Sequence, residues 1–382
     1  MHFHSRRGFL AQTVGASWFG ASLLEQAVLR AAHAQSQAAV PQPALFDIEK
    51  IAEGVYAAIA RPYALINCNA AIFENANDLM IVDTHSKPSA VISLVSQIRR
   101  EITTKPIRYI VNTHFHWDHT QGTPSYKRIA PRADVVSSTA TRNLIAELGP
   151  ARLKASLDEV PKAVERYRKH LEAARTPEEK AHYQRMVSEA QGYVRELRNY
   201  APELPNITFR DELILHDKAH DLHLAFRGRG HTAGDIVVFC PRKKVMAAGD
   251  LLHCFFPYID DGYPREWPRT LRSAGQFDFT RAIGGHGPVQ NGHDRLNQMA
   301  AYIEELTAAV EDGKRRGRPL AELERSITPA TLKTLQNGGY GDFIAAATKR
   351  GDAESVLKTP AEILAGGVKS NVAAVYKTLE RA

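Results

Sequence analysis

The sequence predicts an α/β fold in which polar, ligand-type residues gather where strands end. Between Phe46 and about Ala133 the segments alternate in the order strand, helix, strand and polar loop. The last of these strands, "IRYIVNT", runs directly into "NTHFHWDHTQG", which packs three histidines and one aspartate into six positions. Side chains this costly to bury seldom lie so close together without a partner that uses them.

The composition is that of an ordinary globular protein. The chain has 382 residues, of which 44% are hydrophobic and 24% are charged, and its formal net charge is +7. No apolar run in the body of the chain reaches the length of a membrane-spanning helix, so we expect no membrane span. The basic residues are scattered and form no stripe with aromatic residues, which argues against nucleic-acid binding. The partner that we expect is a small-molecule substrate.

The N-terminal residues resemble a signal for export by the twin-arginine (Tat) pathway. The stretch "SRRGFL" carries paired arginines, a moderately apolar segment follows, and "AAHAQS" supplies the small residues of a cleavage site. We therefore expect residues 1–34 to be removed on export to the periplasm, and residues 35–45 to form a short linker.

The remaining chain alternates between β-rich and helical segments. Strand-forming residues bounded by Gly, Asn or Asp predict strands at residues 51–60, 69–73, 79–84 and 107–113. Helical spacing predicts one helix at residues 88–102. The β pattern returns after Asn206, with successive strands expected at residues 207–216, 222–228, 235–241 and 244–250. Residues 294–382 are mostly helical in pattern and are expected to form a C-terminal extension.

A charged helical hairpin is expected at residues 150–200, between the two groups of strands. Apolar residues from Leu153 to Leu171 recur at steps of four and three, which predicts one amphipathic helix. Thr176 as N-cap, Pro177 at the first helical position and Glu179 as capping-box partner predict the start of a second. The hairpin is expected either to pack as a solvated helical face or to serve as a lid or a homodimer contact.

The histidine-rich stretch has the spacing of a metal site. His114 and His116 are separated by one residue at the end of a strand, so their side chains project the same way and can bind one cation. Asp118 and His119 lie just beyond, where the chain turns, and can face a second cation. Imidazoles combined with a carboxylate suit zinc or iron.

Three later stretches add ligand-type residues in glycine-rich loops that follow strands. They are His231 in "GRGHTAGD", Asp250 in "AAGDLLH" and His286 in "IGGHGPV". The surrounding glycines let backbone and ligand approach closely. Five histidines and two carboxylates, all at strand ends, are therefore expected to converge at one sheet edge.

These motifs, in this order, resemble the metal-binding motifs of the metallo-β-lactamase superfamily over about Phe46 to Gly292. The resemblance implies a four-layer αβ/βα sandwich, in which two β-sheets face each other, helices lie outside and metals bind at one edge. It also implies a domain at residues 46–293, into which the hairpin is inserted.

The resemblance further implies a role for each matching residue. The first metal would be held by His114, His116 and His231. The second would be held by Asp118, His119 and His286. Asp250 would bridge the two metals. Asp118 would also orient the nucleophile as a catalytic residue, and Asp83 in "IVDT" would support the loop from behind.

The function that the resemblance implies is that of a dinuclear zinc hydrolase, with iron or manganese as alternative metals. It would use a metal-bridging hydroxide on the carbonyl group of an ester, lactone, thioester or β-lactam. The β-lactamases themselves usually have Cys or Ser at the place of Asp250, whereas the aspartate resembles thioesterases of the hydroxyacylglutathione hydrolase type and lactonases. Two alternatives stay open: a mononuclear iron enzyme similar to the persulfide dioxygenases, with iron on His114, His231 and Asp250, and a non-catalytic exported accessory protein.

Residues beside the ligand loops are further candidates. His85 and His253 follow Asp83 and Asp250 closely, so each is expected either behind the ligands or facing the substrate. His253 and Tyr258 are also candidates for the general acid. The stretch "HCFFPYIDDGY" holds three aromatic residues that are expected either to line a substrate pocket or to belong to the core: Phe255, Phe256 and Tyr258.

Overall fold

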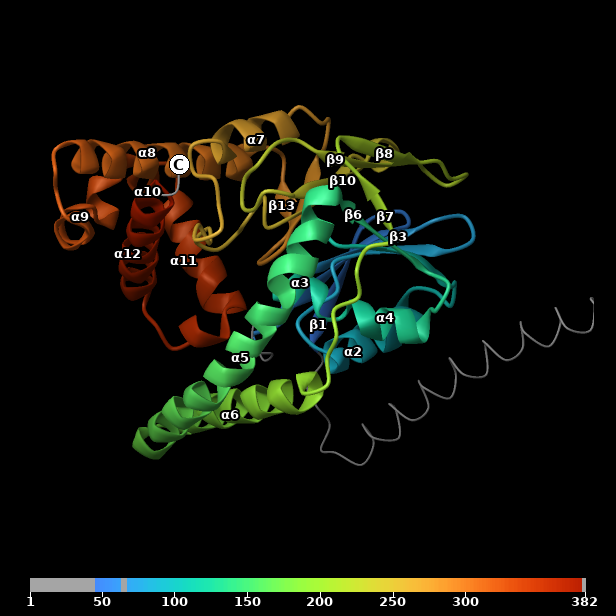
Figure 1. The fold of residues 1–382 in the computed structure, drawn as a ribbon, viewed down its shortest axis with the longest axis horizontal. Coiled ribbons are helices and arrows are strands. Elements are labelled where there is room, and N and C mark those ends of the chain that lie inside the picture. The colour runs from blue at the N-terminus through green and yellow to red at the C-terminus, as the bar shows by residue number, and fades with distance from the viewer. Residues whose placement is uncertain (1–44, 63–66, 380–382) are drawn as a thin grey trace, which may run out of the picture.

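Two β-sheets lie face to face in the computed structural model, which describes residues 45–62 and 67–379 (Figure 1). The first sheet contains, in spatial and chain order, β1 (Phe46–Ala52), β2 (Val55–Ala60), β3 (Ala70–Glu74), β4 (Leu79–Val82), β5 (Ile107–Val111), β6 (Asp134–Ser138) and β7 (Ile207–Phe209). The second contains, in spatial order, β13 (Gln290–Asn291), β12 (Arg281–Gly284), β11 (Val245–Gly249), β10 (Ile236–Cys240), β9 (Leu222–Phe226) and β8 (Glu212–Leu215).

Alternation along the strands separates the inner core from the outer layer of the first sheet. In β4, Met80 and Val82 belong to the cluster between the two sheets, whereas Ile81 belongs to the cluster on the outer face. That outer cluster is completed by α2 (Pro88–Glu101) and α4 (Thr123–Ile129). The short α3 (Trp117–Thr120) follows the end of β5.

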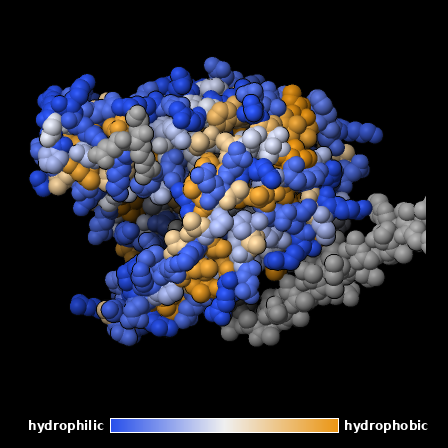
Figure 2. All heavy atoms as spheres, in the orientation of Figure 1, coloured by the Kyte–Doolittle hydropathy of each residue, from blue (hydrophilic) through white to orange (hydrophobic). Residues whose placement is uncertain are grey.

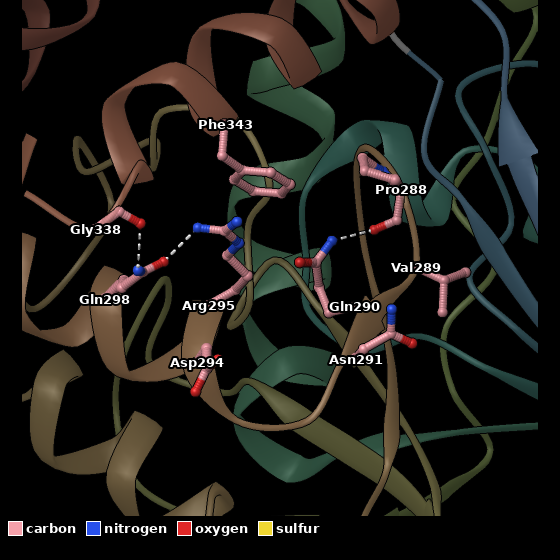
Figure 3. A pocket seen from close by; sticks show the side chains of 9 residues that line it. All are labelled: Pro288, Val289, Gln290, Asn291, Asp294, Arg295, Gln298, Gly338 and Phe343. Atoms are coloured by element: carbon pink, nitrogen blue, oxygen red, sulfur yellow. Dashed lines mark hydrogen bonds between the residues drawn. The ribbon is translucent and has the colours of Figure 1, made fainter.

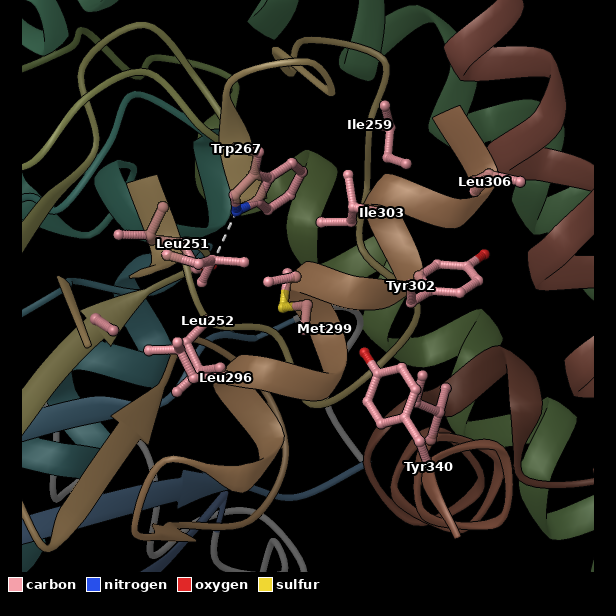
Figure 4. Packing of buried hydrophobic residues seen from close by; sticks show 14 of the residues in the cluster. Leu251, Leu252, Ile259, Trp267, Leu296, Met299, Tyr302, Ile303, Leu306 and Tyr340 are labelled. Atoms are coloured by element: carbon pink, nitrogen blue, oxygen red, sulfur yellow. Dashed lines mark hydrogen bonds between the residues drawn. The ribbon is translucent and has the colours of Figure 1, made fainter. Parts of the chain in front are cut away.

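The outer face of the second sheet is covered by α7 (Trp267–Ala274) and α8 (Asp294–Arg315). Trp267 is fully buried, and its Nε1 donates to the carbonyl oxygen of Leu251 at 3.0 Å. Figure 4 shows Trp267 packed in the same cluster as Met299 and Ile303 of α8. Each buried side chain of this size contributes about 1.5–3 kcal/mol by leaving water. Two facing sheets with helices on both outer faces confirm the predicted four-layer αβ/βα sandwich.

The C-terminal region is helical, as predicted, and shares its core with the second sheet. It continues after α8 with α9 (Leu320–Ser326), α10 (Lys333–Gln336), α11 (Tyr340–Gly351) and α12 (Pro360–Thr378), and with the 3₁₀ turns η2 (Pro329–Thr331) and η3 (Ala353–Ser355). A further 3₁₀ turn, η1 (Pro241–Lys243), links β10 to β11. Val368 and Val372 of α12 lie in the cluster that also contains Met246 of β11. The helices after α8 thus extend one continuous core.

The helical hairpin consists of α5 (Thr139–Ala173) and α6 (Pro177–Leu197), and it projects away from the sheets (Figure 1). The capping box at Thr176 and Glu179 is confirmed. The expected start near residue 150 is wrong, because α5 begins at Thr139, where the Ser138 hydroxyl accepts from the Thr141 backbone N–H at 3.0 Å. Pro150 and Pro161 both lie inside the helix, so neither proline ends it.

Two expected strands are each divided in the structure. Residues 51–60 contain the end of β1 and all of β2, with a turn at Gly54, whose φ of +71° suits glycine. Residues 207–216 contain β7 and β8, which belong to different sheets. The chain therefore crosses between the sheets at residues 210 and 211, a change that an alternating pattern cannot reveal.

The predicted signal at residues 1–34 and nearly all of the predicted linker lie outside the described residues. Among residues 45–62 and 67–379, no helix is both long and apolar enough to span a membrane.

Candidate metal centre

All seven predicted ligands lie at one edge of the sandwich, five of them in loops next to strand ends and two, Asp118 and His119, in the short α3. His114 and His116 come after β5, Asp250 after β11 and His286 after β12, while His231 lies between β9 and β10. β11 and β12 run parallel, as do β4, β5 and β6, so each group of strands presents its carboxyl ends to the same edge. Side chains far apart in the sequence are thereby brought together.

The ligand-type side chains form two clusters joined by Asp250, and Asp250 and His286 also form a third group with His253. The nitrogen and oxygen atoms of the first cluster lie within 4.8 Å of one another, and it consists of His114, His116, His231 and Asp250. The second cluster, with the same spacing, consists of Asp118, His119 and His286. The Asp250 carboxylate lies 3.5 Å from Nε2 of His231 and 3.3 Å from Nε2 of His119. One carboxylate therefore faces nitrogens of both clusters.

The clusters have the donor set and the unsatisfied atoms of a metal site. Nε2 of His114, Nε2 of His119 and Oδ1 of Asp250 are buried and have no hydrogen-bond partner among the described residues. Leaving three such atoms unpaired costs about 1–3 kcal/mol each, which a bound cation would offset. Imidazoles and carboxylates are ligands of zinc, iron and manganese. The residues therefore fit two divalent cations.

Each clustered histidine that contacts the surrounding protein does so through its outward nitrogen. Nδ1 of His114 contacts the Thr113 hydroxyl at 3.0 Å, and Nδ1 of His119 contacts the Asp83 carboxylate at 2.8 Å. Asp83 also accepts from the Thr113 backbone N–H at 2.8 Å, so it lies behind the histidine loop. Such outer contacts orient the ring and leave its other nitrogen free for a metal.

The electrostatics of the second cluster depend on close carboxylate–imidazole contacts. Burial acts to lower the pKa of His286, but the carboxylates of Asp250 and Asp118 outweigh it and raise the pKa to about 9. Burial acts to raise the pKa of Asp118, but His119 and His286 hold it well below its usual range. Without a cation, protons therefore balance the buried carboxylates in this cluster.

The first cluster behaves differently because its histidines face one another. Burial lowers the pKa of His114 well below its ordinary value, and the neighbouring His119 adds to the effect. Burial lowers the pKa of His231 in the same way, with His116 as the next contribution. These rings are neutral at pH 7, which is the form that binds a metal.

Glycines beside Asp250 are required by close packing. A Cβ at position 285 would lie 1.9 Å from Oδ1 of Asp250. Gly249 has a φ of +49°, and a Cβ there would lie 2.3 Å from the Thr113 hydroxyl oxygen. The glycine pattern in the sequence therefore reflects the approach of backbone to ligand.

The two histidines beside the ligand loops lie in different places. His85 is fully buried, its Nδ1 contacts the carbonyl oxygen of Cys68 at 3.1 Å, and its ring packs on Phe46. It does not line the cavity over the metal centre. His253 does, and its Nε2 lies 3.1 Å from Oδ2 of Asp250. Only His253 of these two can reach a substrate.

A cavity of about 290 Å³ opens over the two clusters. It is lined by Asn67, His116, Trp117, Asp118, Arg152, His231, Asp250, His253, Phe255, Tyr258, His286 and residues 351–353. Phe255 and Tyr258 thus line it, as the first alternative expected, whereas Phe256 is absent from its lining and follows the second alternative, the core. Phe256 packs against Tyr302 beside the core of the second sheet.

Part of the cavity wall comes from the hairpin and the C-terminal region. Arg152 belongs to α5, and residues 351–353 connect α11 to η3. The two regions meet where Ala353 packs with Val164, and where the Tyr167 hydroxyl donates to Glu354 at 2.6 Å. Figure 2 shows a hollow between the hairpin and the C-terminal helices.

Sequence reasoning missed several residues at the site. Asp261 contacts Nε2 of His116 at 2.8 Å and forms an ion pair with Arg152. The acidic pair in "YIDDGY", soon after Asp250, is a signal that could have identified Asp261. No local pattern marks Arg152, Asn67 or Asp352, because their position depends on distant parts of the chain.

A second cavity, of about 430 Å³, lies beyond the loop that carries His286 (Figure 3). Its wall includes Gln290, Arg295, Gln298 and Phe343, and Arg295 lies over the Phe343 ring at 4.2 Å. None of the described residues that line it is a histidine or a cysteine. Of these two cavities, only the first is lined by histidines among the described residues.

The fold and this edge-bound set of histidines and aspartates define a metallohydrolase-type α/β protein. The sequence model of the metallo-β-lactamase superfamily matches residues 64–286, which is more than half of the chain. The chain therefore belongs to the metallo-β-lactamase superfamily, whose members are mostly metal-dependent hydrolases.

Three solved structures, two of them of metallo-β-lactamases, are similar to this chain at low sequence identity. One from Pontibacter korlensis has 17% identity and a TM-score of 0.48, covering 67% of this chain and 98% of its own. DIM-1 metallo-β-lactamase has 18% identity and a TM-score of 0.48, covering 68% and 97%. VMB-1 has 18% identity and a TM-score of 0.49, covering 70% and 100%.

Proposed function

We propose that this protein is a dinuclear zinc hydrolase that acts on a small carbonyl substrate. The observation that carries the proposal is the position of Asp250, whose carboxylate faces nitrogens of both buried clusters. His114, His116 and His231 would hold one ion, and Asp118, His119 and His286 the other. When bound, such ions supply an activated water at neutral pH and polarise a carbonyl group.

The chain's own residues would orient the nucleophile and handle the proton. Oδ2 of Asp118 lies 3.1 Å from Nε2 of His286, and this contact fixes the Asp118 carboxylate at the cavity wall. A carboxylate held in this way can accept a hydrogen bond from the attacking water and align it. His253 lines the cavity beside Asp250, and we assign it as the donor to the leaving group.

Supporting features favour compact esters, lactones or thioesters over β-lactams. The cavity of about 290 Å³ is walled by the aromatic side chains of Trp117, Phe255 and Tyr258. Among the described lining residues the one arginine or lysine is Arg152, and it is paired with Asp261, so apart from the metal centre the wall offers no unpaired basic side chain to a substrate carboxylate. Small, uncharged acyl groups fit such a wall best.

The mononuclear iron alternative would use only part of this centre. Iron on His114, His231 and Asp250 would leave Asp118, His119 and His286 as a buried cluster with no role. An accessory protein without catalysis would leave both clusters unexplained, because buried ionisable groups are costly to keep.

The proposal is tested by the metal content and activity of the purified protein. We expect elemental analysis to find about two zinc ions per chain, and hydrolysis of small acyl esters, lactones or thioesters to be faster than that of bulky analogues. One iron per chain, with oxygen uptake on glutathione persulfide, would replace the proposal by the iron alternative. Absence of bound metal after growth in zinc-supplemented medium would overturn it.

We also propose that the protein is exported to the periplasm by the Tat pathway. Replacing Arg6 and Arg7 with lysine should leave the protein in the cytoplasm, because this pathway reads the arginine pair. Cell fractionation checks this, with replacement of the distant Arg315 and Arg316 as the control. The exported protein should begin near Gln35 by intact mass. Export of the Lys–Lys variant at the normal level would remove the proposal.

A further inference from the structure

The inserted hairpin reaches the metal centre through one arginine. Arg152 of α5 donates two hydrogen bonds to Asp261, from Nη1 at 2.8 Å and from Nη2 at 2.6 Å. Its guanidinium also lies over the Phe115 ring, 4.7 Å from the centroid, between the two ligand histidines of that stretch. A bidentate arginine–carboxylate pair fixes both partners in distance and in angle.

The same carboxylate contacts a ligand histidine. Oδ2 of Asp261 lies 2.8 Å from Nε2 of His116, while Nδ1 of His116 points toward Nε2 of His231 at 2.8 Å. When Asp261 accepts a hydrogen bond from the Nε2–H of His116, the lone pair of this ring stays on Nδ1. Nδ1 is the nitrogen inside the first cluster.

A second histidine of the first cluster is held by the same segment. The carbonyl oxygen of Tyr258 lies 3.0 Å from Nδ1 of His231, again the nitrogen that points away from the cluster. Residues 258–261, here termed the ligand-holding loop, therefore orient two of the three histidines of the first cluster. Arg152 is the contact that ties this loop to the hairpin.

We infer that Arg152 is a positioning residue for the first metal. Its ion pair holds Asp261 and the ligand-holding loop against His116, so the hairpin is part of the metal centre and more than a solvated face, lid or dimer contact. The Asp261 side chain is only 18% exposed, so without Arg152 its charge would lose the guanidinium that pairs with it and the loop would shift toward water. The inference rests on the proposed metal centre but needs no substrate.

The test measures zinc affinity on the full chain after metal removal, by competition with a chromophoric chelator. Asp261→Asn should lower the affinity for one of the two zinc ions by about ten- to a hundredfold and leave the affinity for the other unchanged. Arg152→Ala should lower the affinity for the same ion by about tenfold. The affinity of Arg152→Lys should lie between those of Arg152→Ala and wild type. The double variant should be no weaker than Asp261→Asn alone, because both residues act through one contact.

The matched control is Lys154→Ala on the same helix, whose side chain is 78% exposed and pairs with Asp158. It should bind both ions as wild type does. Wild-type affinities for both ions in Arg152→Ala, or equal weakening of both sites, would overturn the inference while leaving the metal centre in place. A wild-type chain that binds no zinc would instead overturn the proposed function itself.

Discussion

Asp250→Ala should lose both metal ions and hydrolyse esters, lactones and thioesters at least about a thousandfold more slowly than wild type. Its carboxylate lies within 3.5 Å of ring nitrogens in both clusters, so its removal takes a ligand from each. Elemental analysis and the rate on the best substrate of the panel measure the two effects.

The fold of this variant should persist, because Asp250 lies just after β11 and the substitution removes no backbone hydrogen bond of the sheet. Asp278→Ala is the matched control, since this aspartate is 78% exposed and pairs only with Lys244 among the described residues. It should keep both metals and full activity. Two retained zinc ions in Asp250→Ala would show that the carboxylate does not join the two clusters.

Removing the metals from the wild-type chain should lower its melting temperature by roughly 16 °C. A ligand at a thousandfold excess over its Kd adds about 4 kcal/mol to the free energy of unfolding, and two ions add about twice that. In a chain of this size, each kcal/mol corresponds to roughly 2 °C. Calorimetry of the metal-free and zinc-loaded protein measures the shift, with calcium as the control because it prefers oxygen ligands.

Zinc binding at pH 7 should also release protons. The neighbouring carboxylates, acting against burial, raise the pKa of His286 to about 9 in the metal-free chain, so this ring is protonated at pH 7 and must lose its proton to bind zinc. The affinity should therefore fall as the pH is lowered. Titration in two buffers of different ionisation enthalpy counts the protons, and a value of zero would contradict this account of the second cluster.

The elements that were predicted well depend on local chemistry. The second hairpin helix starts where Thr176 and Glu179 form a capping box, a pattern that needs only four consecutive residues. The start of the first was missed because the prediction rested on the apolar spacing from Leu153 onward, whereas α5 begins at Thr139 after the Ser138 cap. The division of residues 207–216 between two sheets was missed for a similar reason, since nothing local marks the crossing at residues 210 and 211.

The sequence by itself determined which side chains gather at the strand ends. His114, His116 and Asp250 could be named because strand alternation and glycine-flanked turns are short-range features, and the order of the motifs matches the family. Tertiary structure alone decided what surrounds them. Arg152 meets Asp261 only because α5 runs past the metal edge. An ion pair between residues so far apart in the sequence depends on how whole helices and loops pack, and no local sequence pattern encodes it.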